Sequence, residues 1–410
     1  MDVVYERCCG LDIHKRTIVA CIMVPNADGT PTKQIRTFGT MTEELLQLAD
    51  WLTLHQVTHV AMESTGVYWK PIWNLLEGSF ALLLVNAQRI KAVPGRKTDV
   101  RDAEWIADLL RHGLLQPSFV PDRAQRELRE LTRYRTSLIQ ERTAEVNRLQ
   151  KTLEGANIKL ASVATDVMGT SGRQILTALV AGTTNAAELA ELAKGRLRAK
   201  LPQLEQALTG LVNAHQRFLL AQQLAHIDFL ETIIERVSTE IAARLRPFER
   251  MLEHLDSIPG VGRRTAEIIL AEIGTDMRRF PTAHHLASWA GMCPGNHESA
   301  GKRRSGKPRR GSPWLRWALI EVAQAAGRSK DTYVGAHSRR LTARLGKKKA
   351  SVAVGHTILV IAYHVLVRDE PYRDLGVTYL EERNRQAMER RLVHRLEGLG
   401  YSVQKLELAA

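Results

Sequence analysis

Four acidic residues are spaced as the ligands of a divalent cation would be. Asp12 and Glu63 each end a short apolar segment typical of a β-strand, and Asp99 and Asp102 lie three residues apart in a segment with helical spacing. That spacing places both aspartates on one face of a helix. Carboxylates at strand ends are exposed at a sheet edge, where a crossing helix can meet them. Converging carboxylates repel one another unless a cation neutralises them, and oxygen ligands favour Mg²⁺ or Mn²⁺.

A site of this kind points to phosphodiester chemistry. Two such ions about 4 Å apart can stabilise both the attacking and the leaving oxygen of a phosphodiester. Taken singly, Asp12 could be a turn residue, Glu63 a surface residue and Asp99 a helix N-cap, but their joint placement favours one set. We therefore predict that the metal ligands and catalytic acids are Asp12, Glu63, Asp99 and Asp102.

Ser299 is a candidate of a different kind. It precedes a Gly-Lys-Arg-Arg step in a segment that we predict to be a flexible loop, with cations nearby that could receive a phosphate. A loop serine is usually structural when nothing else supports a role for it. Ser305 and Ser312 lie close by and are its local competitors.

A glycine-containing turn between two amphipathic helical segments lies at residues 258–266, with the sequence Ile-Pro-Gly-Val-Gly-Arg-Arg-Thr-Ala. It favours a helix-hairpin-helix, in which Gly260 and Gly262 permit the tight turn. Backbone N–H groups at the start of the next helix can then hold a phosphate without distinguishing bases. Arg263 and Arg264 favour this DNA-binding interpretation over a plain glycine-rich connection.

The basic charge of the chain is concentrated in one region. The 410 residues carry a formal net charge of +14, and residues 294–350 contain 15 Lys or Arg against three Asp or Glu, a local balance of +12. A localised excess indicates a polyanionic partner, because each neutralised phosphate releases condensed counterions. The alternative is a solvated basic surface. Besides the turn residues, we predict nucleic-acid contacts at Lys302, Arg303, Arg304, Lys307, Arg309 and Arg310.

The first hundred residues alternate patterns typical of strands and helices. Three strand patterns come first and are compatible with antiparallel pairing. Helical and strand patterns then alternate, which is the order of an RNase H-like α/β fold. The predicted strands span residues 6–13, 17–24, 33–38, 59–62 and 80–85; the predicted helices span 41–55, with Thr42 as N-cap, 71–76 and 99–112.

The remainder of the chain has helical patterns. Residues 122–154 carry apolar positions seven apart, as in a coiled coil, and a second long helix is predicted at 203–245. The apolar residues on one side of it are Leu204, Leu208, Leu211, Phe218, Phe229 and Ile233. Helices of this length, about 60 Å, usually pack on each other or across a subunit boundary, although a monomeric hairpin is the alternative. We predict four regions: 1–120, a nuclease domain; 121–246, a helical assembly region; 247–370, a helical DNA-handling domain; and 371–410, a charged helical tail.

Cysteines and apolar runs indicate the compartment. The four cysteines show no metal-binding or disulfide spacing, which is typical of a reducing cytoplasm. The N-terminus lacks a signal-peptide pattern. Residues 351–367 are nearly uncharged but interrupted by two histidines, so a buried helix is predicted there and no membrane partner.

Several segments resemble the DEDD transposases of the "insertion sequence one-ten" family. They are GLDIHK, MESTGVYWKP, GRKTDVRDAEWIADLLRHGLL, SFVP and SGRQILTALVAGTTNAAELAELAKGRLRAK, and the stretch from Gly291 through Arg316 resembles the family's transposase domain. The resemblance implies a RuvC-like nuclease domain, the acids named above as the DEDD set, and Ser299 as a nucleophile that forms a phosphoserine link to DNA. It also implies double-stranded DNA and a bridge RNA as partners, and a homodimer or homotetramer whose subunits share an active site.

Two other functions are compatible with the same residues. A RuvC-like nuclease or junction resolvase would use the four carboxylates and water, and Ser299 would be dispensable. A non-catalytic nucleic-acid scaffold would use the helices for assembly and the basic region for binding, and all four carboxylates would be dispensable.

Overall fold

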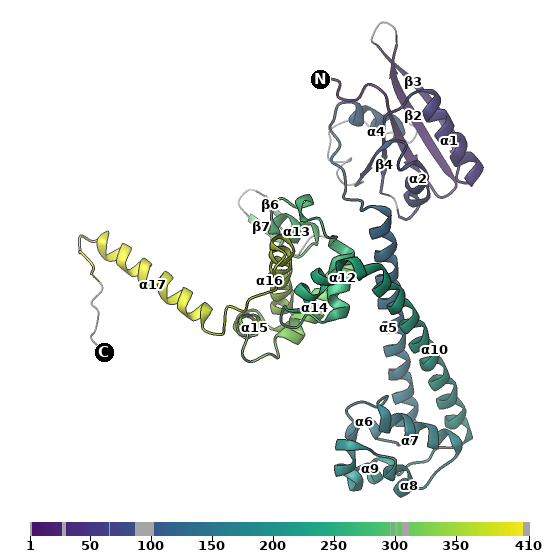
Figure 1. The fold of residues 1–410 in the computed structure, drawn as a ribbon, viewed down its shortest axis with the longest axis vertical. Helices are drawn as coiled ribbons and strands as arrows, with labels where there is room; N and C mark the ends of the chain where they lie inside the picture. The colour runs from purple at the N-terminus through teal and green to yellow at the C-terminus, as the bar shows by residue number, and fades with distance from the viewer. Residues whose placement is uncertain are drawn as a thin grey trace. The chain divides into compact units, whose positions relative to one another are not determined.

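The computed structural model describes residues 2–26, 30–64, 66–86, 102–295, 297–299, 302–305 and 311–404, with the backbone alone at 297–299, 302–305, 384, 386 and 387. The chain divides into two compact units, Met1–Arg123 and Ala124–Ala410. Figure 1 shows a sheet with helices in the first unit and helices in nearly all of the second. The predicted combination of an α/β N-terminal region with a helical remainder is confirmed.

The first unit is built on a five-stranded mixed sheet with the order β3-β2-β1-β4-β5. The first three strands pair antiparallel, whereas β4 is parallel to β1 and β5 is parallel to β4. All five strands were predicted from the sequence, and the structure extends the third of them at both ends. Their bounds are β1 Cys8–Ile13, β2 Thr17–Pro25, β3 Pro31–Gly39, β4 His59–Glu63 and β5 Ala81–Val85.

Helices cover both faces of this sheet (Figure 1). Side chains of β1 alternate between the faces, as strand geometry requires. Cys9, Leu11 and Ile13 pack in a core with α1 (Thr42–Leu54) and α2 (Trp69–Leu76). Cys8, on the other face, packs in a second core with α4 (Asp102–Arg111).

The predicted start of the first helix is wrong by one residue. Met41 is the N-cap, with φ −77° and ψ 153°, and it offers no side-chain cap; Thr42 is already inside the helix. Glu44 instead accepts a hydrogen bond from Gly39 N at 2.9 Å. A carboxylate in the first turn is favourable at the positive end of the helix dipole, so it stabilises this end without a hydroxyl cap.

The second unit contains an antiparallel pair of long helices, α5 (Arg123–Gly155) and α10 (Ala214–Leu245) (Figure 1). Arg244 Nη1 near the end of α10 lies 2.9 Å from Glu127 Oε2 near the start of α5. The far end of the pair carries a small helical core that includes Leu149 and Leu153 of α5. Its short helices are α6 Leu160–Val163, α7 Thr170–Ala181, α8 Ala186–Glu191, η2 Gly195–Lys200 and α9 Leu201–Leu208.

The predicted continuous helix over residues 203–245 is wrong, because the chain breaks between α9 and α10. Asn213 starts α10 with a capping box: its side chain accepts from Gln216 N, and the Gln216 side chain accepts from Asn213 N. The break changes the helical phase, so the predicted apolar side does not continue. Leu204 and Leu208 are buried, whereas Phe218 and Phe229 are 63% and 60% exposed.

The C-terminal helices pack around α16 (Lys347–Arg368). The predicted buried helix is confirmed: by length and composition α16 could cross a membrane, but Val354, Ile358 and Leu359 are buried against neighbouring helices. The other elements are η3 Arg246–Phe248, α11 Glu249–Asp256, α12 Arg263–Ile273, η4 Met277–Arg279, α13 Ala283–Trp289, β6 His297–Ser299, β7 Lys302–Ser305, α14 Pro313–Ala326, α15 Tyr333–Leu345 and α17 Tyr379–Glu397.

Candidate active site and nucleic-acid interface

Asp12 and Glu63 lie next to each other at the ends of two parallel strands. Leu11 of β1 pairs with Met62 of β4, so the next residue of each strand is a carboxylate. Because side chains alternate, both carboxylates are on the face of the sheet that α4 covers. Asp12 Oδ2 is 3.2 Å from His14 Nε2, and the Asp12 side chain is 14% exposed.

The helix α4 brings Asp102 to the same edge of the sheet. A Cβ atom on Gly10 would lie 2.3 Å from Ala103 O and 2.4 Å from Ala107 N, so the α4 backbone rests directly on β1. At its C-terminal end, α4 contacts the residues that precede β1: Val4 N donates to Arg111 O at 2.9 Å. The helix therefore runs against the direction of β1, and its first residue, Asp102, lies toward the strand end that carries Asp12.

The structure thus brings three of the four predicted acids to one end of the sheet, whereas Asp99 lies outside the described residues. In the described part of the chain, no group of three or more His, Cys, Asp or Glu is arranged to hold a metal ion. The donors at this edge are carboxylate oxygens, the ligand type that Mg²⁺ and Mn²⁺ prefer. The donor type of these three residues suits a divalent cation, but Asp12, Glu63 and Asp102 do not by themselves form a metal site in the described structure.

Ser299 lies on a β-hairpin, and the predicted loop is wrong in this respect. It is the last residue of β6 and is the register partner of Lys302, the first residue of β7. Of the predicted contact residues, Arg303 and Arg304 follow on β7. The side chains of these hairpin residues, and the whole of Lys307, Arg309 and Arg310, lie outside the described part of the structure.

The competing serine Ser312 has a structural role. It is the N-cap of α14 and accepts a hydrogen bond from Leu315 N at 3.3 Å. Its hydroxyl donates to Glu272 Oε2 at 3.0 Å. A hydroxyl used in both ways is not free to attack a phosphate in this conformation. Ser305 ends β7, and its side chain is not described.

The predicted helix-hairpin-helix segment forms two helices, α11 and α12, joined by a turn. Gly260 has φ +86°, and a Cβ there would lie 2.7 Å from Ala326 N, so the turn requires glycine. Gly262 is the N-cap of α12. These observations leave the backbone N–H groups at the start of α12 as the candidate phosphate donors.

The two arginines after this turn have different surroundings. Arg263 binds Glu249 with both terminal nitrogens, one of them at 2.8 Å, and its Nε donates to Glu267 Oε1 at 3.1 Å. The hydrogen bond to Glu249 is the main reason that the pKa of Arg263 is raised, and Arg263 lowers the pKa of Glu249 in turn. Arg263 thus joins α11 to α12, whereas Arg264, also exposed, forms no ion pair with a carboxylate among the described residues.

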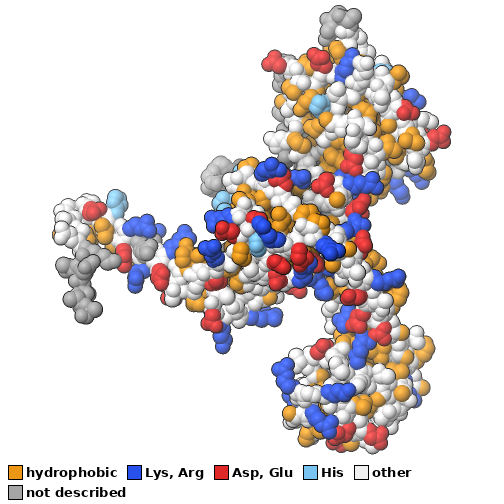
Figure 2. All heavy atoms as spheres, viewed as in Figure 1, with side chains coloured by type: hydrophobic (Ala, Val, Ile, Leu, Met, Phe, Trp, Pro, Cys, Tyr) orange, Lys and Arg blue, Asp and Glu red, His pale blue; other side chains and the backbone are white. Residues whose placement is uncertain are grey.

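Sequence reasoning missed a group of exposed cations in the second half of the basic region at residues 294–350. The helix α15 contains no acidic residue, and Figure 2 shows blue side chains over this part of the C-terminal helices. Within the described residues, none of these cations forms an ion pair with a carboxylate. The α15–α16 basic surface consists of Arg328, Lys330, Arg339, Arg340, Arg344, Lys347, Lys348 and Lys349. The local balance of +12 over residues 294–350 is the signal in the sequence, but it does not distinguish these cations from those near Ser299.

Comparisons with known proteins match two regions of the chain, one that contains the acids and one that contains Ser299 and the Gly260 turn. A family model described as "Transposase" matches residues 9–158, and a model described as "Transposase IS116/IS110/IS902 family" matches residues 252–337. The first match contains Asp12, Glu63, Asp99 and Asp102, and the second contains Ser299 and the turn at Gly260.

Individual relatives cover most of the chain. A probable family 20 transposase of Pseudomonas aeruginosa is 28% identical over 77% of this chain and 85% of its own length. The insertion element IS116 protein of Streptomyces clavuligerus is 30% identical over 62% of this chain and 71% of its own length. A pilin gene-inverting protein of Moraxella bovis is 24% identical over 88% of this chain and 96% of its own length.

These matches define the class as a transposase. More narrowly, the chain belongs to the IS116/IS110/IS902 family, which confirms the family resemblance predicted from its motifs.

Proposed function

We propose that this transposase excises and inserts a mobile DNA element, with an RNase H-like carboxylate site that acts together with Ser299. The observation that carries the proposal is the convergence of Asp12, Glu63 and Asp102 at one sheet edge in a chain of this family. The strand order β3-β2-β1-β4-β5, with three antiparallel strands followed by two parallel ones, supports the RNase H-like assignment. The names of relatives that invert or transpose DNA support recombination.

The carboxylates have the role of holding divalent metal. Asp12, Glu63 and Asp102, together with Asp99, would be the ligands of Mg²⁺ or Mn²⁺. When bound, the cation supplies positive charge to the oxygens of the scissile phosphodiester. The close packing of α4 on Gly10 fixes Asp102 relative to the strands, and His14 orients the Asp12 carboxylate through its 3.2 Å contact.

Ser299 would act as the nucleophile. Its Oγ forms a bond to phosphorus while one phosphodiester P–O bond breaks; the serine proton passes to a base, and the departing oxygen takes up a proton. Attack by the hydroxyl of another strand on the phosphoserine reverses these steps and joins the new ends. Since a serine hydroxyl is a poor nucleophile until it is activated, the carboxylate site must assist it.

Several parts of the second unit would hold nucleic acid. Backbone N–H groups of the Gly260–Gly262 turn would bind phosphate, and Arg264 is better placed for contact than the ion-paired Arg263. The basic residues of the β6–β7 hairpin and the α15–α16 basic surface would neutralise further phosphates. We propose double-stranded DNA and a bridge RNA as partners, and a homodimer or homotetramer as the active assembly.

The experiment is a denaturing gel of the enzyme with labelled element-end DNA, which detects a covalent band that protease removes. Ser299→Ala should bind DNA but give neither this band nor recombinant product, whereas Ser305→Ala should give both. If Ser299→Ala still formed the adduct, another residue would be the nucleophile. If the wild type cut DNA without any adduct, the RuvC-like nuclease function would be correct.

A further inference from the structure

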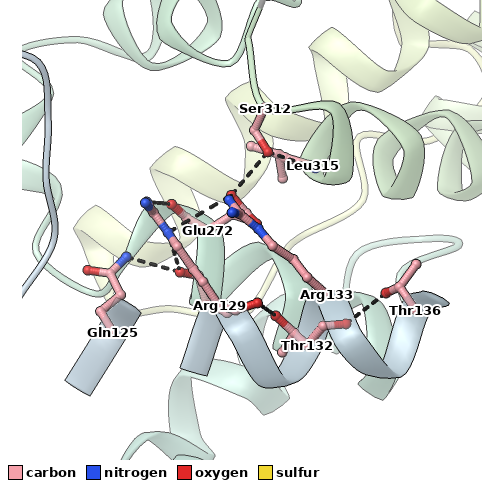
Figure 3. A network of polar contacts seen from close by, with 9 residues as sticks. Gln125, Arg129, Thr132, Arg133, Thr136, Glu272, Ser312 and Leu315 are labelled. Atoms are coloured by element: carbon pink, nitrogen blue, oxygen red, sulfur yellow. Dashed lines mark hydrogen bonds and ion pairs between the residues drawn. The ribbon is translucent and has the colours of Figure 1, made fainter. Parts of the chain in front are cut away.

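The buried carboxylate of Glu272 holds the chain after the β6–β7 hairpin, which carries Ser299. The side chain of Glu272, on α12, is 1% exposed and lies between α5 and the start of α14 (Figure 3). Arg133 of α5 donates to both of its oxygens, at 2.7 Å from Nε and 2.9 Å from Nη2. Ser312 donates to Oε2 at 3.0 Å. Glu272 therefore joins a helix of the long pair to the residue that starts α14.

The same helix α5 also caps the end of α12. The last carbonyl groups of a helix have no partner within the helix. Gln125 Nε2 and Arg129 Nε each donate to Ala271 O at 3.1 Å, and Arg129 also donates to Glu272 O. We call this set the Glu272 clamp; it consists of Gln125, Arg129, Arg133, Glu272 and Ser312.

The clamp lies next to the hairpin neck, which we define as the contact of Gly311 with Ala290 and Gly291 at the two ends of the segment that contains β6 and β7. A Cβ on Gly311 would lie 2.3 Å from Ala290 O and 2.5 Å from Gly291 N, so the outgoing and returning chains touch backbone to backbone. Arg316 of α14 donates to Gly291 O and holds the outgoing chain as well. Ser312 directly follows this neck, so its bond to Glu272 holds the chain at the end of the segment that contains β6 and β7.

Stability alone is a weak explanation for the clamp. A buried ion pair gains little net free energy, because the loss of hydration offsets the attraction. The planar guanidinium of Arg133 instead imposes a fixed orientation on both carboxylate oxygens. The same helix carries a second buried pair, Glu267 with Arg135 at 2.7 Å, which has no hydrogen bond to the hairpin neck among the described residues.

We propose that Glu272 is a positioning residue for Ser299: through Ser312, it sets the hairpin base relative to α5. The inference rests on the proposed role of Ser299 as nucleophile. An attacking hydroxyl must lie in line with the bond that breaks, and a misplacement of about 1 Å costs on the order of 100-fold in rate. A fixed hairpin base limits such errors before DNA is bound.

The first test follows hydrogen exchange of the full-length protein without DNA. Glu272→Gln keeps the shape of the side chain but places a neutral amide before two guanidinium groups. Backbone amides of residues 297–305 should exchange faster in Glu272→Gln and in Ser312→Ala. They should be unchanged in Ser312→Thr, which retains the hydroxyl, and in Glu267→Gln, the matched loss of a buried pair on the same helix. Wild-type exchange in Glu272→Gln and Ser312→Ala, or equal acceleration in Glu267→Gln, would overturn the proposal.

The second test measures the rate of the covalent adduct at saturating DNA. We expect Glu272→Gln and Ser312→Ala to slow it by about tenfold or more with an unchanged Kd for DNA, and Ser312→Thr to restore it. Faster exchange with an unchanged adduct rate would show that the clamp does not position the nucleophile. Because the exchange measurement needs no chemistry, it distinguishes this failure from a wrong nucleophile, which Ser299→Ala reveals separately.

Discussion

Gly10 and Asp12 lie two residues apart on one face of β1, and the first explains the surroundings of the second. Without a side chain at Gly10, the backbone of α4 contacts the strand directly. The helix start then reaches the strand end, where Asp12 and Glu63 are neighbours. The candidate metal site therefore depends on a glycine that has no chemistry of its own.

Gly10→Ala tests this close approach. The new methyl group would meet the backbone of Ala103 and Ala107, which cannot rotate away, so we expect a loss of about 1–3 kcal/mol in the free energy of unfolding. Gly155→Ala is the control, because a Cβ there meets open space. Urea unfolding of both variants gives the comparison; equal stability would show that α4 does not rest on β1.

Asp12→Asn and Asp102→Asn test the carboxylates. Each replaces a proposed metal ligand by an amide of nearly the same shape, so strand cleavage in Mg²⁺ should become undetectable while the unfolding midpoint stays near that of the wild type. Asp108→Asn is the matched control on α4, since Asp108 is 43% exposed and lies beside His112 rather than at the site. Wild-type cleavage by either test variant would contradict the assignment.

At this scale, residue type and local spacing predicted the placement of Asp12 and Glu63 at strand ends but not the setting of Ser299. Asp12 and Glu63 end apolar runs, and such runs mark buried strands directly. The hairpin of β6 and β7 is polar and basic and has no such alternation, because it is defined by pairing between strands. The helix cap at Met41 was missed for a similar reason: the Glu44 contact replaces a hydroxyl cap.

At the scale of whole elements, periodicity predicted helices well and their interruptions poorly. In the pattern over 203–245, the apolar Leu211 and Val212 hide the break that Gly210 introduces, and the capping box of Asn213 and Gln216 marks the new start. The strands β1, β2, β4 and β5 were easier to predict, because each is an apolar run that ends at a polar residue, whereas β3 is mostly polar and its predicted span was too short. Packing partners such as Glu272 and Arg133 are 139 residues apart, so no local pattern could pair them.

The α15–α16 basic surface gives a prediction about an element pair. Lys347→Ala, Lys348→Ala and Lys349→Ala combined should weaken duplex binding and make the log–log dependence of affinity on salt shallower by about 0.9 per lost phosphate contact. The triple replacement of Lys194, Arg196 and Lys200 removes the same charge from the small helical core region and serves as control. A salt dependence equal to that of the control would mean that the surface faces solvent in the complex.

A second set of replacements removes four cations that follow Ser299 in the sequence: Arg303, Arg304, Arg309 and Arg310. It should also make the dependence of nucleic-acid affinity on salt shallower. Comparing the two sets on DNA and on RNA of the element's flank shows which nucleic acid each surface holds. If neither set changes the slope on either ligand, the basic charge of this region has no role in binding.

At the scale of the whole molecule, the proposed chemistry draws on both compact units. Asp12, Glu63 and Asp102 belong to the first unit, and Ser299 belongs to the second. The two long helices and the exposed Phe218 and Phe229 of α10 suit contacts with another copy of the chain. We therefore expect that the carboxylates of one subunit serve the serine of another.

Mixing two inactive variants tests this expectation. In a dimer of Asp12→Asn with Ser299→Ala, a shared site pairs the intact carboxylates of one subunit with the intact serine of the other. Random mixing of equal amounts makes half of the dimers mixed, and each has one working site of two, so about a quarter of the wild-type adduct should form. The measurement is the protease-sensitive band on a denaturing gel, after the variants are expressed together so that subunits mix. Each variant alone should give no band. If the mixture also gives none, although tagged subunits co-purify, the serine and the carboxylates act within one chain.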